Sequence, residues 1–308
     1  MLSPETIPVE RFEELFAGDP QTIEQRLVAL RLPATSHPDV SLLPQIESQI
    51  ALVQAMQGRI DEAMVTLDRA EQTPGARIPL ARIRLWLERG RVYHQARQMS
   101  AAFPWMLAAY RLSLVEGHDF HTINAAHLLA IVAHDASVKI LWNRIAIELA
   151  DVTRDDKARA WRGVLQNNLG QAYLAAGRFE AANHAFTKCR EFAALEQNAL
   201  LDRSGRWGIA KSLRALGQTH QALAMQHELL QEYEELEQKG TLPLELIRMA
   251  RGLVYEELAE LPTRHPAEFA AQAINDLSVN TWFRDIEPVR WARLQQMLGR
   301  ERESGTTS

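Results

Sequence analysis

Small, aromatic and turn-forming residues follow one another at helical spacings through most of this chain. The clearest segment holds Gly170, Tyr173, Gly177, Ala182 and Phe186. Gly170 and Ala182 place small side chains where two helices can cross closely, and the two aromatic rings fill the space beside them. Gly177 falls where the chain must turn back, because glycine adopts the left-handed conformation of such turns without steric cost. The spacing therefore predicts two antiparallel helices joined by a tight turn.

The same spacing recurs elsewhere in the chain with a period of about 40 residues. The best second copy lies upstream and has small, aromatic or apolar residues at the equivalent positions: Gly90, Tyr93, Ala102, Met106 and Ala109. Weaker copies occupy residues 58–70, 125–142, 217–222 and 244–277. No segment competes with the two-residue alternation of a half-buried strand. The pattern predicts an all-α chain built from repeated helix pairs.

The order Leu-Gly-x-x-Tyr-x-x-x-Gly-x-x-x-x-Ala-x-x-x-Phe, which begins at Leu169, resembles that of the tetratricopeptide repeat (TPR) family. The resemblance extends from about Leu42 to Leu277. It implies an all-α fold, an α-solenoid of antiparallel helix pairs that forms a TPR-like superhelix. The period is longer than the family's usual ~34 residues. Because each helical turn takes about 3.6 residues, the added residues lengthen the helices by one to two turns.

The chain is expected to consist of a repeat region with different structures at its two ends. We expect N-terminal capping helices in residues 1–40 and the tandem TPR-like repeats in residues 41–280. Residues 281–298 predict a C-terminal capping helix, which a solenoid needs because its last repeat would otherwise expose an apolar face. The polar segment 299–308 predicts a disordered tail. One continuous solenoid is favoured over two domains.

Composition removes several classes of function. The formal net charge is −5, with 34 Lys and Arg against 39 Asp and Glu. A protein that binds nucleic acid through bulk electrostatics normally carries a basic excess, so no nucleic-acid partner is expected. No apolar run is long enough to cross a bilayer, and the N-terminus shows no signal-peptide pattern. With Cys189 as its lone cysteine the chain can form no internal disulfide, which favours a cytoplasmic location.

Motifs of the common enzyme classes are absent from the sequence. There is no His-Glu-x-x-His zinc motif, no glycine-rich nucleotide loop and no Gly-x-Ser-x-Gly nucleophile elbow. Cys189 occupies the small position of a repeat, where a buried thiol stays protonated and unreactive. We therefore expect no enzymatic activity, no catalytic residue and no cofactor.

Four histidines lie close together in the sequence, at His118, His121, His127 and His134. His118 and His121 are near enough on one helix to share a metal ion. His127 and His134 would lie about 10.5 Å apart along an α-helix, which is too far for one ion. A polar stripe on one helical face explains the histidines better, so no metal site is predicted. Incidental placement and a metal-dependent enzyme are the competing interpretations.

In TPR proteins the first helix of each pair lines a concave groove, and the resemblance implies which side chains would face a ligand here. Basic, amide and histidine side chains dominate these positions: Arg84, Arg91, His94, Asn124, His127, His134, Asn167, Gln171, Trp207, Lys211 and Arg214. In a net acidic chain such a surface suits an acidic or carboxylate-bearing partner. The alternative is that these charges have no role in binding, because the exposed surfaces of helices are normally charged.

The sequence thus favours a non-enzymatic scaffold or adaptor that binds a protein or peptide partner in the groove, with no nucleic-acid or membrane partner. The alternative is a ligand-sensing regulatory protein that binds a small peptide or an acidic metabolite there. Both hypotheses stay open, because a fold class does not define a function. No residue pattern specifies an oligomeric state.

Overall fold

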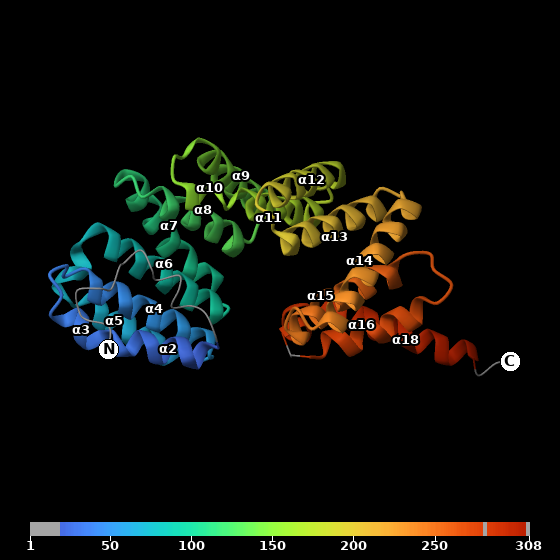
Figure 1. The fold of residues 1–308 in the computed structure, drawn as a ribbon, viewed down its shortest axis with the longest axis horizontal. Coiled ribbons are helices and arrows are strands. Elements are labelled where there is room, and N and C mark those ends of the chain that lie inside the picture. Colours follow the sequence, from blue (N-terminus) through green and yellow to red (C-terminus); the bar gives the residue numbers. More distant parts are fainter. Residues whose placement is uncertain (1–18, 280–281, 306–308) are drawn as a thin grey trace. The chain divides into compact units, whose positions relative to one another are not determined.

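The computed structural model of the chain describes residues 19–279 and 282–305 (Figure 1). Within these residues every regular element is a helix, so the all-α expectation is confirmed. None of the described helices is both long and apolar enough to cross a membrane. The chain divides into two compact units, Met1–Leu165 and Gln166–Ser308, with the boundary inside α11 (Arg162–Ala175). Each unit is described on its own, and the continuous repeat region over 41–280 stays a prediction.

Unit 1 begins with two short helices, α2 (Pro20–Ala29) and α3 (Arg31–Thr35). They stand where the sequence predicts capping helices within residues 1–40, and the part of that segment before residue 19 lies outside the described residues. Three helix pairs follow: α4 (Leu42–Met56) with α5 (Ile60–Glu71), α6 (Pro79–Gln95) with α7 (Met99–Val115), and α8 (Asp119–Val132) with α9 (Ala136–Val152). A 3₁₀ helix, η3 (Pro74–Arg77), joins the first two pairs, and α10 (Asp156–Arg159) follows the third.

Unit 2 contains most of α11 and the helices after it. These are α12 (Phe179–Leu195), α13 (Ala199–Ala215), α14 (Thr219–Lys239), α15 (Leu244–Glu260), α16 (Pro266–Leu277), α17 (Trp282–Ile286) and α18 (Pro288–Gly305). Consecutive helices from α12 to α16 pack on one another, and α16 also packs on α18, which stands where the sequence predicts a closing helix. The helical residues of α18 continue into the segment 299–308, for which the sequence predicts disorder.

Residues in the left-handed conformation end many of the helices. Gly177, with φ of +69°, follows α11, and Gly217, with φ of +77°, follows α13. Arg97 and Gln197 take the same conformation without being glycine, with φ of 60° and 53°. At each of these ends the next residue donates its main-chain N–H to a carbonyl in the last helical turn, which closes the helix. Gly177, Gln197 and Gly217 are evenly spaced, so a helix with its turn has a constant length in this part of the chain.

Phe186 is the centre of a close contact among three helices of unit 2. It lies on α12, fully buried between Gly170 of α11 and Gly208 of α13. A Cβ atom at Gly170 would lie 2.7 Å from the phenyl ring, and one at Gly208 only 2.4 Å from it. Only glycine permits this approach. Gly170 and Phe186, which the sequence pattern places at a helix crossing, thus meet directly, and Gly90 of unit 1 lies in the same way against Met106.

Candidate functional site

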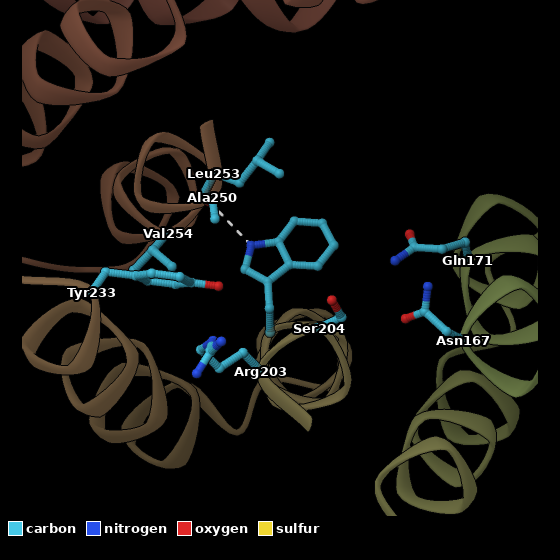
Figure 2. A pocket seen from close by; sticks show the side chains of 9 residues that line it. Asn167, Gln171, Arg203, Ser204, Tyr233, Ala250, Leu253 and Val254 are labelled. Atoms are coloured by element: carbon cyan, nitrogen blue, oxygen red, sulfur yellow. Dashed lines mark hydrogen bonds between the residues drawn. The ribbon is translucent and has the colours of Figure 1, made fainter. Parts of the chain in front are cut away.

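A pocket of about 200 Å³ opens on unit 2 (Figure 2). Helices α11, α13, α14 and α15 line it with Asn167, Gln171, Arg203, Ser204, Trp207, Tyr233, Ala250, Leu253 and Val254. Figure 2 shows Asn167 and Gln171 projecting from one helix toward Ser204 on another. Asn167, Gln171 and Trp207, which the sequence predicts to face a groove, therefore line one pocket together.

Trp207 forms a fixed wall of this pocket. Its indole Nε1–H donates a hydrogen bond to the main-chain carbonyl of Leu253 on α15, over 3.1 Å. The ammonium group of Lys211 lies 4.7 Å from the centre of the indole ring, within the range of a cation–π contact. Because the polar end of the ring already has a partner, the orientation of the indole is set in the free protein.

Lys211 and Arg214 share one buried acid, Glu257 of α15. The carboxylate accepts a hydrogen bond from Arg214 Nε at 2.8 Å and lies 3.2 Å from Lys211 Nζ, while the Glu257 side chain is 1% exposed. Burial opposes the ionisation of Glu257, but the two cations outweigh this effect and hold its pKa below the usual value. Both cations of α13 thus have acidic partners on α15 within unit 2, Glu257 and, at 4.0 Å from Arg214, Glu260, so neither requires an acidic ligand as its ion-pair partner.

Two residues of the pocket lining each hold a buried polar atom that has no hydrogen-bond partner within the described residues. These atoms are Oδ1 of Asn167 and Nε of Arg203. Arg203 is only 6% exposed. Its Nη1 donates to Glu232 at 2.8 Å, and its guanidinium lies 5.8 Å from the centre of the Tyr233 ring. A buried polar atom without a partner costs about 1–3 kcal/mol.

In unit 1 two of the predicted groove residues, Arg91 and Asn124, belong to a hydrogen-bond network that connects three helices. Gln49 of α4 lies 3.3 Å from Glu88 of α6, to which it donates a hydrogen bond. Glu88 also accepts from Arg91, at 2.8 and 3.0 Å, and Arg91 donates to Oδ1 of Asn124 on α8 at 3.0 Å. Glu88 is 3% exposed, so a buried acid compensates a predicted cationic position here too.

Two histidines of α8 are neutral beside the arginines of α6. The pKa of His127 is lowered to about 4, mainly by burial and to a smaller extent by the charge of Arg91. The pKa of His121 is lowered to about 3, mainly by burial and to a smaller extent by the charge of Arg84. The His127 ring also packs edge-on against Trp161, with 5.5 Å between the ring centres. Both imidazoles are therefore uncharged at neutral pH.

His94 and His134 lie at the ends of helices. His94, near the end of α6, is half-buried, and burial lowers its pKa. Because α8 ends at Val132 and Ala133 is extended, His134 lies in the turn before α9. There its Nε2 is 3.3 Å from the Ser100 hydroxyl. The prediction of a histidine stripe on one helical face is therefore wrong for its last member, since the helix stops before reaching it.

The thiol of Cys189 is not a candidate nucleophile. The residue is buried at the small position of its repeat, and burial raises its pKa to about 12. The thiol is therefore protonated at neutral pH. In the described part of the chain no three His, Cys, Asp or Glu side chains come together in a way that could hold a metal ion.

Sequence reasoning missed several residues that shape these sites. Glu88 stands three residues before Arg91, and that spacing on a helix is an ion-pair signal that could have found it. Glu257 and Leu253 lie on α15, where the repeat pattern is loose and gives no register. Arg203 falls beside a predicted groove position, but nothing in the local sequence indicates that it is buried.

The pattern of helix pairs defines the class of fold, a TPR-like α-solenoid, and comparisons with solved structures agree. The Signal Transduction ATPase with Numerous Domains (STAND) protein with a tetratricopeptide repeat sensor, from Pyrococcus horikoshii, matches with a TM-score of 0.64 at 12% identity. The match covers 96% of this chain and 46% of that one, so this chain spans about half the length of the STAND protein.

Two further structures have a similar fold. The TPR-like repeats of a putative kinesin light chain from Podosopora anserina match with a TM-score of 0.51 at 16% identity, over 60% of this chain and 93% of that one. NprR in complex with its cognate peptide NprX matches with a TM-score of 0.55 at 15% identity, over 97% of this chain and 84% of that one. No protein-family model and no curated protein matches the sequence.

Proposed function

We propose that the chain is a non-enzymatic scaffold that binds an extended segment of a partner protein or peptide in the pocket of unit 2. The observation that carries the proposal is one pocket lined by both polar and apolar residues, in which Asn167 and Arg203 each hold a buried polar atom without a partner. An extended main chain offers N–H donors and C=O acceptors in alternation, which a carboxamide and a guanidinium can bind.

The rest of the lining suits an apolar side chain of such a segment. Ala250, Leu253 and Val254 of α15 provide apolar surface next to the indole of Trp207. Asn167 and Gln171 are one helical turn apart on α11, so their amides can follow the same main chain. Removing an apolar side chain from water in this pocket would supply affinity, and the amides would supply orientation.

The chemistry of the segment follows from the charges around the pocket. Lys211 and Arg214 already form ion pairs with acids of α15, so an apolar anchor matters more than acidic residues. The similar fold of NprR, which was solved with its cognate peptide NprX, supports a peptide as the ligand. The sensing alternative draws its support from the tetratricopeptide repeat sensor of the STAND protein.

Selection of random peptides on the full chain tests the proposal. Enriched peptides are labelled, and their affinities for wild type, Asn167→Ala and the control Asn183→Ala are measured by fluorescence anisotropy. Asn183 lies on α12 and is not part of the pocket lining. Because Oδ1 of Asn167 has no partner in the free protein, Asn167→Ala should keep or raise the thermal stability. We expect it to weaken peptide binding by about fivefold, or about 1 kcal/mol.

Peptides that bind Asn167→Ala as tightly as the wild type would overturn the pocket assignment. If no peptide is enriched and a metabolite raises the unfolding midpoint instead, the sensing hypothesis replaces the scaffold, because a ligand of the folded state stabilises it.

A further inference from the structure

A second pocket, of about 230 Å³, opens in unit 1 where α7 ends, α8 begins and α9 ends. Its apolar lining comes from Leu114 of α7, Ile123 of α8, and Leu149 and Val152 of α9. Ile123 is buried, whereas Leu114 is 51% and Val152 is 79% exposed. Apolar side chains that gather around a hollow in this way mark a surface suited to binding.

Two opposite charges belong to the same lining. Asp119 is the first residue of α8, and its Oδ2 accepts a hydrogen bond from the Thr153 hydroxyl. The second oxygen of Asp119 remains available to a ligand. Arg154, the residue after Thr153, is exposed and also belongs to the pocket lining. Within the described residues neither Asp119 nor Arg154 takes part in an ion pair.

The threonine hydroxyls of the lining are already used inside the protein. Thr122 Oγ1 donates to the main-chain carbonyl of His118 at 3.0 Å. Thr153 Oγ1 donates to Asp119 and accepts from the main-chain N–H of Asp155 at 3.1 Å. The pocket lining therefore combines an apolar surface with one acidic residue, Asp119, and one basic residue, Arg154.

We propose that this pocket binds an apolar α-amino acid in its zwitterionic form. The α-ammonium group of the ligand binds the free oxygen of Asp119, and the α-carboxylate binds Arg154, whose guanidinium matches the geometry of a carboxylate. The aliphatic side chain lies among Leu114, Ile123 and Val152. A pocket of about 230 Å³ has room for an amino acid the size of leucine. This site is separate from the peptide pocket of unit 2 and does not depend on it.

Titration of the full chain with L-leucine, followed by two-dimensional NMR of the main-chain amides, tests the proposal. We expect saturable shifts at Thr122, Ile123 and Thr153 with a dissociation constant on the order of 1 mM. Leucinamide lacks the carboxylate and N-acetyl-L-leucine lacks the ammonium group, while both keep the aliphatic side chain. We expect each of them to bind about fivefold more weakly than L-leucine, because each loses one exposed ion pair.

Two variants separate recognition of charge from simple apolar contact. Arg154→Gln should weaken L-leucine binding by about fivefold and leave leucinamide binding unchanged. Arg144→Gln, an exposed position on α9 outside the pocket lining, is the matched control and should bind L-leucine like the wild type. Equal affinity for all three ligands, or an absence of saturable shifts with L-leucine, would overturn the proposal.

Discussion

Arg214 of α13 and Glu257 of α15 form an ion pair with 2.8 Å between Nε and Oε2. The preceding residue, Glu256, is equally buried and pairs with Arg290 of α18. Two consecutive glutamates of α15 thus connect it to two different helices. Each carboxylate has been removed from water, so each needs its cation to remain charged. These contacts hold the helix that contributes Leu253 to the peptide pocket.

Glu257→Gln should destabilise the protein by about 3 kcal/mol at neutral pH, since it leaves Lys211 and Arg214 without their buried partner. The folded pKa of Glu257 lies below that of an unfolded glutamate, which is about 4.3. Its stabilising effect is therefore complete at neutral pH and is lost as the pH falls through the folded pKa. Urea unfolding followed by circular dichroism measures the loss. Glu235→Gln, an exposed change on α14, is the control and should alter the stability by less than about 0.5 kcal/mol.

Gly208→Ala should destabilise the protein by about 2 kcal/mol, because the added methyl group overlaps the Phe186 ring. Thermal denaturation of Gly208→Ala, Phe186→Leu and the double variant measures the coupling between the two positions. The smaller leucine side chain makes room for the methyl group, so the double variant should be more stable than the sum of the single effects implies. Simple additivity would refute the steric explanation.

Gln197→Gly should stabilise the protein by roughly 0.5–1 kcal/mol, because glycine adopts a positive φ without the strain that a Cβ atom brings. Gly217→Ala should shift the midpoint of urea unfolding in the opposite direction, since it places a Cβ atom in the same conformation. A lower midpoint for Gln197→Gly would mean that the side chain of Gln197 makes a contact that outweighs the strain.

His127→Gln should make the stability of the protein less sensitive to acid. The pKa of His127 is about 4 in the folded chain and about 6.5 in an unfolded one. The folded state therefore binds fewer protons, and stability falls as the pH drops from about 6.5 towards 4, by up to about 1.4 kcal/mol per pH unit. Free energies of unfolding measured from pH 7 to pH 5 should show a smaller slope for the variant. Parallel curves for the two proteins would contradict the assignment.

The helix pairs and their close crossings could be predicted from the sequence because packing leaves few choices there. A glycine such as Gly170, opposite an aromatic residue such as Phe186, appears as a fixed spacing within one repeat. The turn at Gln197 could not be found in this way, because its residue type does not indicate a positive φ. A close helix crossing can therefore be predicted from the sequence when both of its residues belong to one repeat.

The candidate site was predictable only in part. Asn167, Gln171 and Trp207 follow from the helical register, and all of them line the pocket. The acid beneath α13 could not be foreseen, since Glu257 belongs to another repeat and its pairing depends on how two helices lie against each other. Ion pairs across helices arise from tertiary packing, which a single stretch of sequence does not record.

The contact of Phe186 with Gly170 and Gly208 also limits how this fold can be divided into modules. The ring belongs to α12, but it requires a glycine on the helix before it and another on the helix after it. A single helix pair moved into another solenoid would bring the ring without one of its two glycines, and an alanine there would collide with it. A transferred segment must therefore include the three consecutive helices α11, α12 and α13, one and a half repeats, to keep both glycines with the ring.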